Sequence, residues 1–107
     1  VFHIIYLQHK EIFNEKEWVR FNNSKFKYAE CSTCTKKIRL EKYVKTEGFF
    51  TEYSKSTASE DMAEVYSHMI YLKKDEINQI RKSDSILNNK ILFIESKIKQ
   101  IDNSFTF

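Results

Sequence analysis

The sequence contains no proline and a single glycine, Gly48, among its 107 residues. Proline and glycine are the residues that most often interrupt helices and shape tight turns. Asparagine, aspartate, serine and lysine must therefore form most of the turns in this chain. The scarcity of breakers also allows helices to run without internal interruption.

Two further absences limit the possible functions. No run of 18 apolar residues occurs in the sequence, which excludes a membrane-spanning helix. The net charge is only +3, from 18 basic and 15 acidic residues spread along the chain, which argues against a nucleic-acid partner. The aromatic content of 15% instead indicates an ordered globular structure. The length predicts a single domain or a fragment of one.

Cysteine is also scarce: the chain has only Cys31 and Cys34, spaced as Cys-x-x-Cys. A thioredoxin-like redox pair would need a helix start and a βαβ context. A structural zinc site would need two more ligands, and the sequence has no second Cys-x-x-Cys. The pattern favours a local disulfide or two ordinary thiols, and a pair completed by another subunit or a missing segment stays open.

The first half of the chain combines helical and extended patterns. Apolar residues recur with helical spacing in residues 1–13, and Asn14 begins a second, short helix with Glu17 at the capping-box position. Residues 23–30 and 38–44 alternate polar and apolar side chains, which is typical of strands. We therefore expect a short helix and an extended excursion within residues 14–50. The two extended segments could pair as a hairpin.

The second half is more strongly helical. Thr57-Ala-Ser-Glu60 fits a helix start, and we expect a helix over residues 58–73. Residues 73–84 form a short helix or a linker, and Asp84 or Ser85 begins a last helix over residues 84–102. An apolar stripe on that helix predicts the side that faces the core, and it consists of Leu87, Ile91, Ile94, Ile98 and Ile101. Lysines such as Lys90 are expected on the solvated side of the same helix. The predicted fold class is α+β, mainly helical, with three to four helices and a small hairpin or extended excursion around residues 23–50.

Two acids in the 58–73 helix invite a functional interpretation. Glu60 and Glu64 are four residues apart and so share one helix face. Small Ala63 and Ser67 lie on the same face, which suits close approach by another helix, although an ordinary solvated face is the alternative. A carboxylate that faces a packed neighbour needs a cation or a metal as its partner.

Several motifs resemble the second half of a gluzincin metallopeptidase site. They are Gly48-Phe49-x-x-x-Tyr53, the run Glu60-Asp61-Met62-Ala63-Glu64, the start Val1-Phe2-His3 and the tail Phe93–Ser104. Together they are similar to the lethal factor-like protease domains of anthrax-type toxins and to bacterial zinc-binding metallopeptidases. The resemblance implies a zincin-like C-terminal half and zinc-dependent hydrolysis of a peptide or protein substrate.

The resemblance also implies roles for individual residues. His3 would be the second histidine of a His-Glu-x-x-His helix, with its His-Glu just upstream of Val1. His3 and Glu60 would bind Zn²⁺, and Glu64 would hydrogen-bond a zinc histidine. Tyr53 would be catalytic and reach the scissile carbonyl. Ligands about 2.0–2.2 Å from one zinc ion must lie within about 4 Å of each other, so His3 and Glu60 should meet in space.

The missing His-Glu has consequences for activity. The parent protein is expected to be a zinc metallopeptidase, whereas the 107-residue chain alone is expected to be inactive and to contact a missing N-terminal segment or another chain. Two alternatives stay open: an inactive zincin-fold domain used for binding or scaffolding, and an unrelated small helical interaction module. Family resemblance alone suggests a secreted or cell-surface location.

Overall fold

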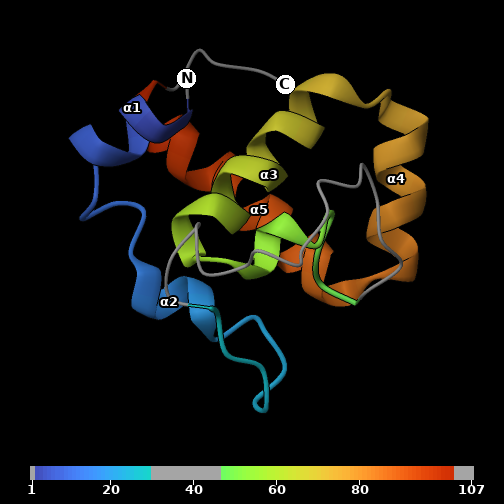
Figure 1. Ribbon diagram of the computed structural model, residues 1–107. Coiled ribbons are helices and arrows are strands. Elements are labelled where there is room, and N and C mark those ends of the chain that lie inside the picture. The colour runs from blue at the N-terminus through green and yellow to red at the C-terminus, as the bar shows by residue number, and fades with distance from the viewer. Residues whose placement is uncertain (1, 30–46, 103–107) are drawn as a thin grey trace.

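The computed structural model describes residues 2–29 and 47–102 and is mainly helical in these ranges (Figure 1). The described residues form five α-helices, with a 3₁₀-helix, η2, before the third of them. These elements are α1 (Phe2–Gln8), α2 (Glu15–Val19), η2 (Tyr53–Lys55), α3 (Ala58–Tyr71), α4 (Lys74–Ser83) and α5 (Ser85–Ile101). The prediction of a mainly helical chain is confirmed, but the predicted number of three to four helices is too low, since the described residues form five α-helices.

The β part of the predicted α+β class is not seen in the described residues. No strand occurs in residues 2–29 or 47–102, where Phe49 alone forms an isolated bridge. Residues 23–29 are turns and irregular backbone, because Asn23 turns the chain through hydrogen bonds to Lys25 and Phe26. The rest of the predicted hairpin, including Cys31 and Cys34, lies outside the described residues.

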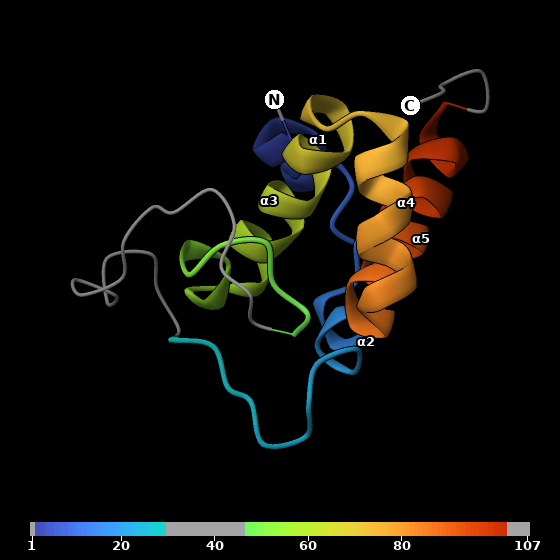
Figure 2. The ribbon, with the colours of Figure 1, turned by 90° about the vertical axis from the view of Figure 1, so that its right-hand side faces the viewer.

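Helix α3 is the centre of the molecule (Figure 1). It packs against α1, α2, η2 and α5, while α4 packs against α5. Figure 2 shows α4 and α5 side by side as a helical hairpin, joined at Asp84. None of the helices in the described ranges has the length and apolar character that crossing a bilayer requires. The arrangement places residues from both ends of the sequence around the first turn of α3.

The helix starts follow from short polar residues in the sequence. Asn14 Oδ1 accepts hydrogen bonds from the backbone N–H groups of Lys16 and Glu17, as predicted for α2. Thr57 Oγ1 accepts from Glu60 N at 3.1 Å, and Asp84 Oδ1 accepts from Leu87 N at 2.9 Å. Each cap satisfies a backbone donor that a helix end leaves open and is worth about 1 kcal/mol.

The core lies between α3 and α5 and is closed by the aromatic side chains of the N-terminal half. Its fully buried members are Phe13, Trp18, Phe50, Met62, Val65, Leu87, Ile91 and Ile94. The apolar stripe predicted for the last helix is confirmed, since its residues are buried or packed against this core. The prediction that Lys90 lies on a solvated face is wrong, because Lys90 is fully buried among these residues.

Candidate functional site

The histidine and the glutamate predicted to bind zinc lie next to each other. His3 Nε2 from α1 is 3.2 Å from Glu60 Oε1 in the first turn of α3. His3 is 49% exposed and Glu60 20% exposed, so the pair sits at the surface with one side open to solvent. Packing of α1 against α3 brings these residues together although they are 57 positions apart in the chain. The separation lies inside the limit of about 4 Å for two ligands of one zinc ion.

Glu64 lies one turn further along α3 and is close to His68. Its Oε2 atom is 3.8 Å from His68 Nδ1, and His68 Nδ1 lies 2.7 Å from the backbone oxygen of Glu64. The His68 ring also stacks on Phe50, with centroids 4.3 Å apart and planes at 10°. Within the described residues, no hydrogen bond or ion pair joins Glu64 to His3. Glu64 therefore shares a helix face with Glu60 but has a different imidazole as its neighbour.

Tyr53, the predicted catalytic tyrosine, is the first residue of η2. It is half-buried, and η2 packs directly against α3. The preceding turn is fixed by Thr51, whose hydroxyl accepts from Ser54 N at 3.1 Å and lies 2.9 Å from Ser54 Oγ. This turn therefore fixes the start of η2, where Tyr53 lies, just before the helix α3 that carries Glu60.

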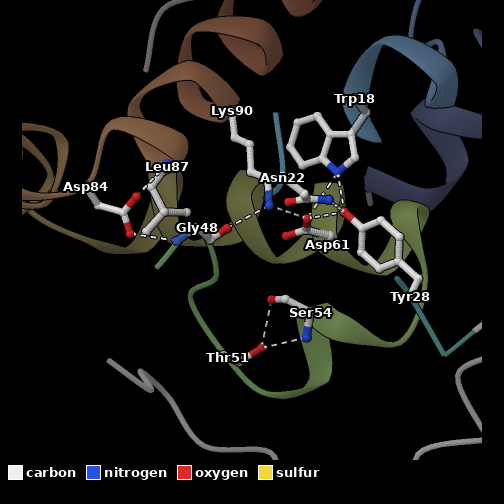
Figure 3. A network of polar contacts seen from close by, with 10 residues as sticks. All are labelled: Trp18, Asn22, Tyr28, Gly48, Thr51, Ser54, Asp61, Asp84, Leu87 and Lys90. Carbon is white, nitrogen blue, oxygen red and sulfur yellow. Dashed lines mark hydrogen bonds and ion pairs between the residues drawn. The ribbon is translucent and has the colours of Figure 1, made fainter. Parts of the chain in front are cut away.

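A buried polar centre surrounds Asp61, the residue that follows Glu60 in the first turn of α3 (Figure 3). Asp61 is completely buried, and its Oδ2 atom accepts three hydrogen bonds. They come from Trp18 Nε1 at 3.1 Å, Tyr28 Oη at 2.6 Å and Lys90 Nζ at 2.7 Å. The donors belong to α2, to the segment after α2 and to α5. One carboxylate thus joins three separate parts of the chain to α3.

The Lys90 ammonium is satisfied on every side. Besides Asp61, it donates to the backbone oxygen of Gly48 at 2.7 Å. Its nitrogen also lies 4.0 Å from the centroid of the Phe49 ring, a favourable cation–π distance. Gly48 N in turn donates to Asp84 Oδ2 at 2.8 Å, so the residue that caps α5 also holds the glycine. Lys90 therefore connects the segment before η2 to both long helices.

Gly48 is the position where only glycine fits. Its φ angle is +89°, a region that other residues rarely adopt. A Cβ atom built there would lie 2.7 Å from Ile86 Cγ2, so a side chain would also collide with α5. The single glycine of the sequence thus allows the backbone to approach α5 closely enough to bind Lys90 and Asp84.

Burial controls the ionisation of this centre. Loss of solvation raises the pKa of Asp61, while the Lys90 charge and the hydrogen bonds from Lys90, Tyr28 and Trp18 oppose the rise. Loss of solvation lowers the pKa of Lys90, and Asp61 opposes that shift. Burial, and then the charge of Asp61, raises the pKa of Tyr28. The phenol therefore stays protonated and donates a hydrogen bond to Asp61. Each ion depends on the other, because neither has water around it.

The sequence held a signal for this centre that the assignment of the 58–73 helix face to Glu60 and Glu64 did not use. Asp61 is four residues before Val65 and eight before Met69, so it lies on the apolar stripe of α3. Lys90 has the same spacing to Ile94 and Ile98 on α5. An acid and a base at core positions of two helices indicate a buried ion pair when the helices face each other.

The available residues fit part of a zinc site. An imidazole nitrogen and a carboxylate oxygen are donors that zinc prefers, and His3 and Glu60 present them at a ligand-to-ligand distance. No group of three or more His, Cys, Asp and Glu side chains that could hold a metal ion occurs in residues 2–29 and 47–102. The described residues thus offer two donors for a metal.

Comparison with known families gives one match. A family model described as "Putative zinc-binding metallo-peptidase" matches residues 2–103, which is almost the whole chain. No curated protein and no solved structure matches the sequence. The matched range includes both His3 and Glu60.

Proposed function

Because the chain belongs to this zinc-binding metallo-peptidase family, we propose that it forms part of the active site of a zinc-dependent peptidase. In this proposal, His3 and Glu60 are two of the three protein ligands, which makes the site a gluzincin site of the lethal factor-like type. The observation that carries the proposal is the 3.2 Å separation of His3 Nε2 and Glu60 Oε1 across two helices. A peptide or protein is the proposed substrate.

The third protein ligand belongs one helical turn before His3. A His-Glu-x-x-His helix that ends at His3 requires His-Glu immediately before Val1 in the full-length protein, and this glutamate would be the general base. The two histidines and Glu60 would hold the zinc ion, which would supply a water of lowered pKa and polarise a substrate carbonyl. The sequence of the parent protein checks this requirement directly.

The chain's own residues would orient the reaction. The side chain of Glu60, one-fifth exposed, reaches His3 Nε2 from the first turn of α3. The two side chains would hold a metal between them. Glu64 would orient the other zinc histidine, since outer partners of this kind set the tautomer and direction of the ring. Tyr53 would donate its hydroxyl proton in a hydrogen bond to the carbonyl oxygen of the scissile peptide, where negative charge develops.

Family membership does not favour the two alternative functions. An unrelated helical interaction module would have no reason to match a metallo-peptidase model over residues 2–103. An inactive zincin-fold domain would leave the contact between His3 and Glu60 without a metal. The proposal keeps the expectation that the 107-residue chain is inactive without the segment that supplies the base.

Metal analysis of the full-length protein tests the proposal. We expect one zinc ion per chain, measured by elemental analysis, and hydrolysis of a peptide library that stops when zinc is removed by a chelator. His3→Ala and Glu60→Gln should each lose zinc and activity. His9→Ala and Glu11→Gln are matched controls, since they remove another histidine and another acid from the same half of the molecule. Zinc retained at full occupancy by both His3→Ala and Glu60→Gln would contradict the assignment.

A further inference from the structure

The first turn of α3 carries two neighbouring acids with opposite surroundings. Glu60 is partly exposed beside His3, whereas Asp61 is completely buried and accepts hydrogen bonds from Trp18 and Lys90 (Figure 3). Successive residues of an α-helix point about 100° apart around its axis. The direction of Asp61 therefore determines the direction of Glu60.

We propose that Asp61 and Lys90 are positioning residues that hold Glu60 against His3 by fixing the rotation of the first turn of α3. This inference rests on the proposed function for its catalytic meaning, because Glu60 is the proposed zinc ligand. Neither Asp61 nor Lys90 touches the proposed metal position, since both are buried while His3 is half exposed.

The contacts make this rotation well defined. Donors reach Asp61 Oδ2 from α2, from Tyr28 and from α5, so a rotation of α3 would break hydrogen bonds in several directions at once. The Thr57 cap also restrains this turn, but it holds the backbone of Glu60 and not the rotation of the helix about its axis. The core packing of Met62 and Val65 acts on the turns that follow. Lys90 also binds Gly48, so the same ammonium anchors the segment that leads to Tyr53.

The test uses the full-length protein and a variant without a buried charge. Asp61→Asn alone leaves the Lys90 ammonium unpaired in the core and risks unfolding. The double variant Asp61→Asn/Lys90→Met removes both charges, and we expect it to fold, as judged by circular dichroism. Ile80→Ala is the matched control, because it weakens the packing of α4, whose main neighbour is α5, against the core.

Two readouts separate positioning from simple stability. In metal-free protein, nuclear Overhauser contacts between the His3 ring and the side chain of Glu60 report their proximity directly. We expect these contacts in the wild type and in Ile80→Ala, and their loss in the double variant. The zinc dissociation constant of the double variant should rise about 10- to 100-fold, as for outer partners of metal ligands, and that of Ile80→Ala should not change.

The outcomes distinguish this inference from the proposed function. If the folded double variant keeps the contacts between His3 and Glu60, the positioning role is overturned, whatever its zinc affinity. The same conclusion follows if Ile80→Ala loses them too, because general destabilisation then explains the effect. If His3→Ala and Glu60→Gln both leave zinc binding unchanged, the proposed function fails. The Overhauser contacts alone then decide the positioning inference, because they are measured without metal.

Discussion

Glu60 and Asp61 are adjacent in the sequence, are both acids and lie in the first turn of the same helix, but their surroundings differ. In the part of the chain that the structure describes, the side chain of Glu60 lies beside the half-exposed imidazole of His3. Asp61 has three donors and no exposure. The comparison shows that a buried acid whose hydrogen-bond donors are all protein groups stabilises the packing of the helices. An acid at the surface with a single weakly held partner can still accept a metal.

The energetic reason is the cost of desolvation. A buried ion loses its water, so its partners must replace that water completely, and removal of one partner leaves the other uncompensated. A partly exposed pair keeps water on one side, and its contribution to stability is correspondingly small. The two sides of the first turn of α3 should therefore respond very differently to mutation.

The largest expected effect comes from breaking the buried pair. Lys90→Ala leaves the Asp61 carboxylate without its counter-ion, and the free energy of unfolding should fall by about 3–5 kcal/mol. Glu60→Gln is the matched change on the open side and should alter it by less than about 1 kcal/mol. Urea denaturation of the metal-free protein measures both values. Equal losses in the two variants would refute the contrast.

A smaller effect should follow from closing the space beside Gly48. Gly48→Ala places a Cβ atom against Ile86 at a positive φ angle, and we expect a loss of about 1–3 kcal/mol in the free energy of unfolding. Ile86→Ala removes the colliding methyl group, so in that background the same glycine substitution should cost less. The cost that persists comes from the positive φ angle and from the Cβ atom of residue 86, which stays 3.3 Å away. A Gly48→Ala variant as stable as the wild type would show that the backbone can move away from α5 and Lys90.

The subtlest effect concerns pH. The pKa of Tyr28 is raised in the folded state, so above pH 10 the unfolded chain releases this proton while the folded chain keeps it. The free energy of unfolding should therefore fall as pH rises, by up to about 1.4 kcal/mol per pH unit from this group. Tyr28→Phe should flatten that slope between about pH 10 and 11.5, although it loses the hydrogen bond to Asp61. Parallel stability curves for the two proteins would indicate that Tyr28 is not shielded by burial.

The sequence predicted much of the helical framework. Asn14, Thr57 and Asp84 were recognisable as helix starts because short polar side chains satisfy backbone donors locally. The apolar stripe on residues 87–101 predicted which side of α5 is buried, because helical spacing alone fixes a face. The hairpin expected around residues 23–50 was less well founded, since short alternating segments carry little information without a partner strand.

What the sequence determined by itself was therefore local: the helices, their caps, their apolar faces and the family to which the motifs point. The resemblance to a metallopeptidase site led us to expect His3 beside Glu60, and the structure places them 3.2 Å apart. Only the tertiary structure decided that Lys90, expected on a solvated face, is the buried partner of Asp61. The physical reason is that spacing along a helix fixes the direction of a side chain, whereas the identity of its partner depends on how distant helices pack.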